Sequence, residues 1–151
     1  MNINYAKIIL FLVFIFLNCE SSHNISYTGS RYCQTLNDAL DPDLRPDGGY
    51  CTQNMWSISQ HGSQVYYSVD YITYLGGSLS LNVVHPVGKL FYNGMRNDAG
   101  IGHVSYQSLG SGEAYREASI IDVSFAGKYN VIYEEINEVI SYVSPTLEVV
   151  P

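Results

Sequence analysis

The sequence predicts an all-β protein: a small antiparallel β-sandwich of Greek-key, jelly-roll or immunoglobulin-like topology, forming a single domain after an N-terminal signal peptide. Three observations support this fold class. Hydrophobic and polar residues alternate over several short runs, which is the pattern of half-buried strands. Glycine and proline turn signals recur about every eight to twelve residues, as in sandwiches and barrels. The 14 tyrosines add a residue type that favours strands.

The clearest alternation runs from Val65 to Tyr71. Tyr67 shares a face with the valines of this run, so we expect Tyr67 and Tyr71 in the core. Tyr66 shares the opposite face with Ser68, and we expect that face at the surface. This run is the strand on which the predicted core is built.

Further strands are expected along the rest of the chain. The run at 79–83 follows a glycine pair and predicts an antiparallel hairpin with the first strand. Later strands are expected at 89–92, which ends in Asn93-Gly94, around 104–106, and at 119–125, 129–133 and 139–143. In the run 119–125, Ile121, Val123 and Phe125 share one face. In the segment 139–143 the apolar residues fit both helical and strand spacing, and the β-branched residues favour a strand over a helix.

The N-terminus has the pattern of a secretory signal peptide. Lys7 precedes an unbroken apolar run of ten residues, Ile8–Leu17, and small polar residues follow. A membrane-spanning helix needs about 20 apolar residues, so this run is too short and an uncleaved anchor is the weaker interpretation. We expect residues 1–21 to be removed and the protein to be secreted, with no transmembrane segment in the mature chain.

The three cysteines support export. Removal of residues 1–21 takes Cys19 and leaves Cys33 and Cys51, which we expect to form a disulfide in an oxidising compartment. We assign residues 22–56 to an N-terminal arm and a disulfide-tied loop, with one helical turn near 35–40, and residues 57–151 to the sandwich core. The alternative is a bacterial lipoprotein signal, in which Cys19 carries lipid and holds the protein at the cell surface.

Charge limits the classes of partner. The net charge is −7 and only 14% of the residues are charged, with no basic cluster. Such an acidic surface is a poor match for nucleic acid or an anionic membrane. Asn24-Ile25-Ser26 is a glycosylation sequon, so Asn24 is the expected glycan site in a eukaryotic host.

One segment has the composition of a calcium loop. Asp41, Asp43 and Asp47 lie in a proline- and glycine-rich stretch, and clustered carboxylates can supply the hard oxygen ligands that Ca²⁺ prefers. Arg45 breaks the EF-hand pattern, and the alternative is an ordinary surface turn. No other cofactor is expected.

The sequence does not predict an enzyme. The histidines have no second ligand at a metal spacing, and no nucleophile elbow or phosphate loop is present. Adjacent glutamates such as Glu134 and Glu135 face opposite sides of a strand, so they cannot form a hydrolytic pair.

The aromatic residues are the remaining functional signal. Trp56, Tyr66, Tyr74 and Tyr92 are candidates for an exposed platform that contacts a glycan or an extracellular protein. The expected function is therefore a secreted, non-catalytic binding, adhesion or structural module. The alternatives are a secreted inhibitor or effector that inserts loops into a target enzyme, and a lipid-anchored surface lipoprotein of the same fold.

Two secreted sandwich families share local features with the chain. The stretch from Gln64 to Tyr92 resembles the prepeptidase C-terminal accessory domain and the Golgi-dynamics luminal domain, and Gly127-Lys128-Tyr129 resembles the later G-x-Y element of the latter. These resemblances imply a two-sheet antiparallel fold. The membrane anchor of full-length Golgi-dynamics receptors has no counterpart here.

Overall fold

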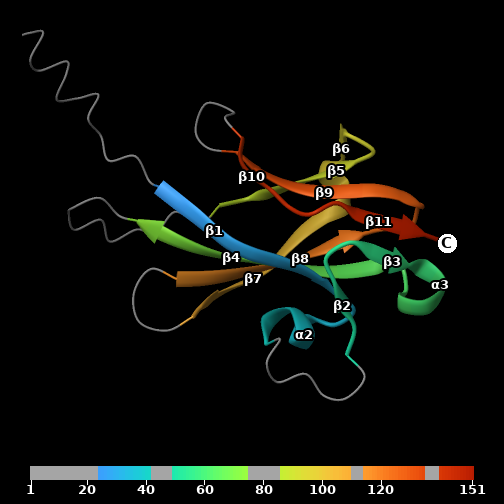
Figure 1. Ribbon diagram of the computed structural model, residues 1–151, viewed down its shortest axis with the longest axis horizontal. Helices are drawn as coiled ribbons and strands as arrows, with labels where there is room; N and C mark the ends of the chain where they lie inside the picture. The colour runs from blue at the N-terminus through green and yellow to red at the C-terminus, as the bar shows by residue number, and fades with distance from the viewer. Residues whose placement is uncertain (1–23, 42–48, 75–85, 110–113, 135–139) are drawn as a thin grey trace, which may run out of the picture.

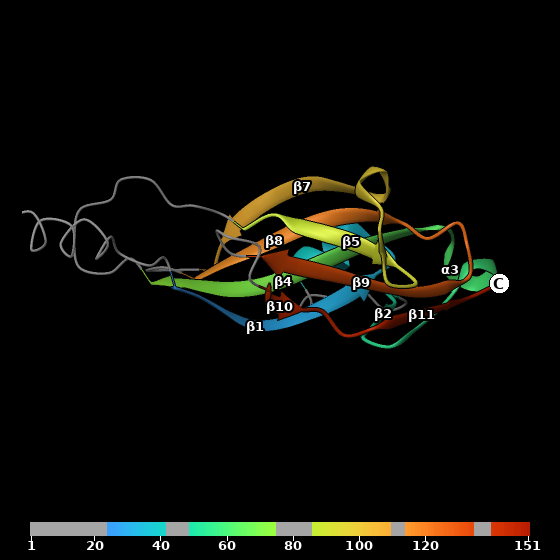
Figure 2. The same cartoon turned by 90° about the horizontal axis from the view of Figure 1, so that it is seen from above.

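The computed structural model describes residues 24–41, 49–74, 86–109, 114–134 and 140–151. It confirms the predicted fold class, because two β-sheets pack face to face as a sandwich (Figures 1 and 2). The first sheet has the order β2 (Cys51–Thr52), β1 (Asn24–Cys33), β4 (Gln64–Tyr74), β8 (Ala114–Asp122), β7 (Ile101–Ser108). The second has the order β3 (Met55–Ser57), β11 (Leu147–Val150), β9 (Gly127–Glu134), β5 (Gly88–Tyr92), β6 (Met95–Arg96), and β10 (Ile140–Val143) also pairs with β9.

The inner faces of the two sheets form the core. Tyr67 and Tyr71 of β4 are fully buried together with Val65 and Val69, as the alternation predicts. From the opposite sheet, β9 contributes Tyr129, Val131 and Tyr133. Tyrosine rings fill much of this interior, so part of the tyrosine content serves packing rather than recognition.

The outer face of the first sheet is covered, contrary to the expectation for Ser68. Helix α2 (Leu36–Leu40) lies over this face, and Ser68 is fully buried. Arg31 donates hydrogen bonds to Ser68 Oγ (3.3 Å) and to the carbonyl of Ala39 (3.1 Å). Arg116 donates to the carbonyl of Leu40 and to both carboxylate oxygens of Asp70, at 2.6 and 2.9 Å. The two arginines therefore anchor the C-terminal end of α2, where its carbonyls lack helical partners.

The segment assigned to an N-terminal arm is part of the sandwich. β1 pairs with β4 from Asn24 to Cys33 and is an interior strand of its sheet. Tyr32 and Trp56 are fully buried in the common core, so the described residues 24–41 and 49–56 pack with the described strands of 57–151. The hairpin partner predicted for β4 is the run 79–83, and in the described structure β4 pairs with β1 and β8. Residues 79–83 themselves lie outside the described part of the chain.

The C-terminal segment is extended, as predicted. β10 pairs with β9, and β11 then pairs antiparallel with β9 and parallel with β3. A short helix, α3 (Ile58–His61), connects β3 to β4, and a 3-10 turn, η2 (Asp98–Gly100), precedes β7. The C-terminus thus lies beside α3 at one end of the sandwich (Figure 1).

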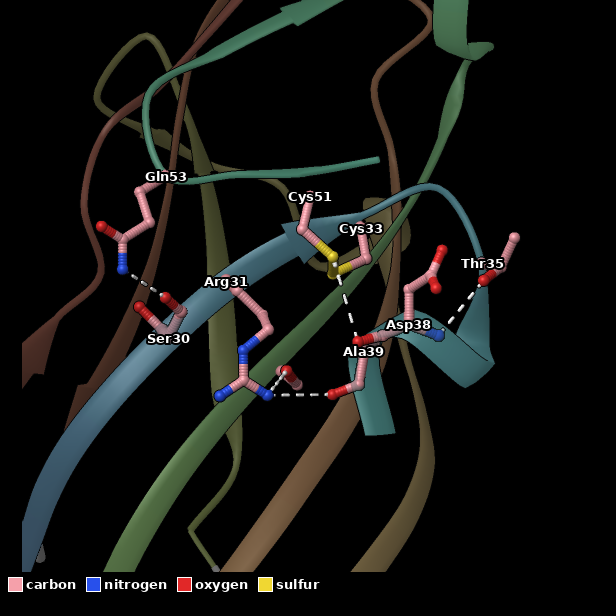
Figure 3. Close-up of a disulfide and its surroundings, with 9 residues drawn as sticks. Ser30, Arg31, Cys33, Thr35, Asp38, Ala39, Cys51 and Gln53 are labelled. Carbon is pink, nitrogen blue, oxygen red and sulfur yellow. Dashed lines mark hydrogen bonds between the residues drawn. A yellow bond between two sulfur atoms is a disulfide. The ribbon is translucent and has the colours of Figure 1, made fainter. Parts of the chain in front are cut away.

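The predicted disulfide is confirmed. Cys33 and Cys51 are bonded and join the end of β1 to β2 (Figure 3). The helical turn expected near 35–40 is α2, and Thr35 caps it by accepting a hydrogen bond from the backbone N–H of Asp38 at 3.2 Å. Among the described residues, no helix is long and apolar enough to cross a membrane. The expected signal peptide and Cys19 lie outside those residues.

Candidate functional site

The turn between β5 and β6 is built by its local sequence. Asn93 and Gly94 have φ values of 48° and 80°, the left-handed backbone that a two-residue type I′ hairpin requires. Asparagine and glycine accept this conformation at the lowest steric cost, so the sequence specifies the turn. Tyr92 and Met95 are consequently paired across the hairpin. The Met95 side chain is 75% exposed.

The turn between β8 and β9 lies against this hairpin. β8 ends at Asp122, whose carboxylate accepts a hydrogen bond from the backbone N–H of Ser124 at 2.9 Å, an Asx turn that redirects the chain. Phe125 follows and is 71% exposed. The expectation that Phe125 shares a buried face with Ile121 and Val123 is therefore wrong, because the strand stops before it. Val123 is buried as expected.

Hydrogen bonds hold the two turns together. The Tyr92 hydroxyl donates to the carbonyl of Ala126 at 2.8 Å. Asn93 and Lys128 exchange two bonds: Asn93 N–H donates to the Lys128 carbonyl at 2.7 Å, and Lys128 N–H donates to Asn93 Oδ1 at 2.8 Å. Tyr129 donates from its hydroxyl to the Phe125 carbonyl at 2.7 Å. We call the surface formed by Tyr92, Asn93, Met95, Phe125 and Ala126 the Phe125 end.

Two exposed charged residues, Asp122 and Lys128, flank the Phe125 end. None of its five side chains carries a charge. Burial raises the pKa of Tyr129, and the neighbouring Tyr92 hydroxyl raises it further, so the hydroxyl that supports Phe125 stays a neutral donor. Arg96 and Asp98, beyond β6, pair with each other at 2.6 Å. The arrangement presents two large apolar side chains on a rigid support and is suited to binding rather than to bond-breaking chemistry.

The predicted aromatic platform is not assembled as expected. Trp56 is 0% exposed; it packs in the core, and its indole N–H donates to the carbonyl of Gly62 at 2.8 Å. It therefore cannot offer a ring to an external ligand, which corrects that prediction. Tyr66 is half-buried on the outer face of the first sheet, and Tyr92 is half-buried beneath the Ala126 turn. Tyr74 ends β4, with its side-chain surroundings outside the described part of the structure.

The calcium and glycan sites stay predictions. Asp41 is exposed just after α2, while Asp43 and Asp47 lie outside the described residues. In the part of the chain that is described, no three His, Cys, Asp or Glu side chains are grouped so that they could hold a metal ion. Asn24 begins β1, opposite Tyr74 of β4.

A polar pocket lies beside the disulfide. It has a volume of about 360 Å³. It is lined by Arg31, Cys51, Thr52, Gln53 and Asn54. The Gln53 amide donates to the Ser30 carbonyl at 3.1 Å (Figure 3), and Thr52 donates to Asn54 Oδ1 at 3.1 Å. The amide and hydroxyl groups of residues 52–54, together with the Arg31 guanidinium of β1, are suited to hydrogen bonding a small polar ligand.

Of the residues of the Phe125 end, sequence reasoning identified only Tyr92 as a site candidate, although signals for the others exist. The Asn93-Gly94 pair marks a hairpin tip and places Met95 just beyond it. Asp122 followed two residues later by Ser124 marks the Asx turn that ends β8 before Phe125. Neither signal reveals exposure, which depends on where the second sheet ends.

No protein-family model matches this chain, and no curated protein matches it. The local resemblances to two secreted sandwich families therefore do not extend to a family match.

Proposed function

We propose that the protein is a secreted, non-catalytic β-sandwich module that binds another extracellular protein through the Phe125 end. The observation that carries this proposal is the exposure of Phe125 (71%) and Met95 (75%) on two mutually bonded turns. Exposed aromatic and methionine side chains are enriched in protein interfaces, and an aromatic ring loses little conformational entropy when it is buried.

Two features favour a protein partner at this surface over a glycan. Trp56, the residue best suited to stacking on a sugar ring, is buried in the core. The Phe125 end also has no charged side chain, so the matching surface is an apolar pocket rather than an acidic or sulfated chain. The disulfide and the lack of a membrane-spanning helix among the described residues are compatible with an extracellular location.

The experiment uses photo-crosslinking at a single position. A photoreactive phenylalanine replaces Phe125, and in the control protein it replaces Met55, which is 54% exposed on β3. Extracellular fluid from the source organism supplies the candidate partner proteins. We expect one discrete adduct from position 125 and none from position 55. Equal adducts from both positions contradict the proposal.

Affinity for the crosslinked protein supplies the decisive measurement. Phe125→Ser is expected to weaken binding by about 30-fold, the effect of losing an interface anchor worth about 2 kcal/mol. Met55→Ser is the matched control and is expected to bind as the wild type does. Unchanged affinity of the Phe125→Ser protein refutes the assignment. If the crosslinked partner is an enzyme that the protein inhibits, the module acts as an inhibitor through the same surface.

A glycan is the second candidate partner, and the polar pocket beside the disulfide supports it. A panel of free saccharides, followed by titration with the best binder, tests this site. Gln53→Ala is expected to abolish binding, whereas Gln107→Ala, an exposed amide on β7, is expected to leave it intact. Loss of binding in both variants, or in neither, contradicts a sugar site in this pocket.

A further inference from the structure

Glu117 is a carboxylic acid in the interior of the sandwich. It lies in the middle of β8, between Val69 of β4 and Tyr106 of β7, and is 2% exposed. Its Oε1 accepts a hydrogen bond from Ser119 Oγ at 3.3 Å. Among the described residues, its buried Oε2 has no hydrogen-bond partner. An ionised carboxylate in this position is costly, because buried charge requires full hydrogen bonding or a close counter-charge.

The ionisable groups that face Glu117 come from three strands. β7 supplies His103 and Tyr106, and His103 Nδ1 lies 3.7 Å from Glu117 Oε1. β4 supplies Tyr71, and β9 supplies Tyr133, whose buried hydroxyl also has no partner among the described residues. None of these groups is a lysine or arginine. Tyr133 is a neutral neighbour because burial raises its pKa well above the ordinary value, and burial raises the pKa values of Tyr71 and Tyr106 as well.

Edge strand β7 separates Glu117 from water. β7 is the outermost strand of its sheet, next to β8 (Figure 2). The His103 side chain is 40% exposed and stacks on Tyr106, with ring centroids 4.0 Å apart. A bulge between His103 and Ser105 interrupts the β7–β8 pairing beside this stack. Displacement of β7 would therefore expose the carboxyl group to water.

We propose that the protonation state of Glu117 acts as a latch on β7. When Glu117 is protonated, β7 stays paired with β8 and the interior beneath His103 and Tyr106 is closed to water. When Glu117 ionises, β7 loosens from β8 and water enters. This device goes beyond the proposed binding function, because it lies in the sandwich interior beneath β7. Its consequence is a folded module whose edge strand is secured in acidic surroundings and opens more often in alkaline ones.

The direction of the pH effect follows from burial. Burial raises the pKa of Glu117 from 4.5 to about 7, opposed by smaller effects of the neighbouring Ser119 and Tyr133 hydroxyl groups. Because the closed state holds the proton more tightly than the open state, its advantage is complete below pH 4.5 and is lost as the pH rises through 7. With these two values, the equilibrium constant for opening increases about 70-fold between pH 5 and pH 8.

Hydrogen exchange of the backbone amides tests the latch. Exchange is measured at pH 5 and pH 8 and is corrected for the intrinsic rate at each pH. In the wild type we expect opening of β7 to rise about 70-fold, with no comparable rise in β9. Glu117→Gln, which has the same shape and cannot ionise, is expected to remove the rise. Glu148→Gln, on the exposed face of β11, is the matched control and is expected to keep it.

Three results would overturn the proposal. The first is a pH response that persists in Glu117→Gln. The second is a rise of equal size in β7 and β9, which would mean that the whole sandwich opens rather than its edge strand. The third is a Glu117 carboxyl signal, followed by carbon NMR in the wild-type protein, that titrates below pH 5. This last measurement needs no variant and therefore does not depend on whether Glu117→Gln folds.

Discussion

The disulfide between Cys33 and Cys51 gives the most quantitative prediction for stability. The bond closes a loop with a sequence separation of 18 residues. Closing a loop of this size removes unfolded-chain entropy equivalent to about 3 kcal/mol at 25 °C. The perturbation is the double variant Cys33→Ala, Cys51→Ala, which removes the bond without leaving a free thiol. We expect its free energy of unfolding to fall by about 3 kcal/mol.

The structure shows which part of the sandwich the disulfide holds in place. The disulfide ties β1 to β2, a two-residue strand that leads directly into β3 and Trp56. Trp56 is the only tryptophan of the chain and is fully buried, so its fluorescence reports unfolding of this region. The assay is urea unfolding followed by that fluorescence. With a slope of about 2 kcal/mol per molar urea, the midpoint should drop by about 1.5 M.

Reduction of the wild type provides the matched comparison. Wild-type protein in reductant should unfold at the same urea concentration as the double variant, and the double variant should not respond to reductant. A midpoint shift below about 0.5 M would refute the entropic reasoning, since it corresponds to only about 1 kcal/mol. Different midpoints for the reduced wild type and the variant would refute the attribution to the bond itself.

The remaining predictions concern single groups. Trp56→Ala should lower the unfolding free energy by about 3 to 5 kcal/mol, measured by circular dichroism, because it opens a cavity and leaves the Gly62 carbonyl without its donor. Arg116→Leu should cost about 2 kcal/mol and raise amide exchange in α2, because it removes both ion-pair bonds to Asp70. Thr35→Ala should cost about 1 kcal/mol by removing the α2 cap, and Thr35→Ser should restore most of it. The intact mass of exported protein should match cleavage after residue 21 with a deficit of about 2 Da for the disulfide, whereas an added lipid mass on Cys19 would refute release into the medium.

Features set by local spacing were predictable. Tyr67 and Tyr71 are buried as their alternation indicates, because successive strand residues must point to opposite faces. Thr35 caps α2 and Asn93-Gly94 forms a two-residue turn, since both depend on backbone groups a few residues apart. The cysteine pairing was also accessible, because the predicted removal of Cys19 leaves two partners.

Burial that depends on distant elements was not predictable. Ser68 alternates as a surface residue, yet α2 covers it, and α2 is held there by Arg31 and Arg116 from two different strands. Tryptophan is a residue type common in binding sites, but the parallel pairing of β3 with β11 places Trp56 in the core. Glu117 was not identified as a site residue, since an acid in an alternating run gives no local sign that it faces inward.

The sequence by itself determined several of the strands, the tight turn at Asn93-Gly94 and the class of fold, because each depends on steric and hydrogen-bonding preferences within a few residues. Only the tertiary structure decided which polar groups are buried and which apolar groups are exposed. Phe125 is exposed because β8 ends before it, whereas Glu117 is buried because its side of β8 faces the opposite sheet. Exposure is a property of the assembled surface, and it requires contacts between residues far apart in the chain.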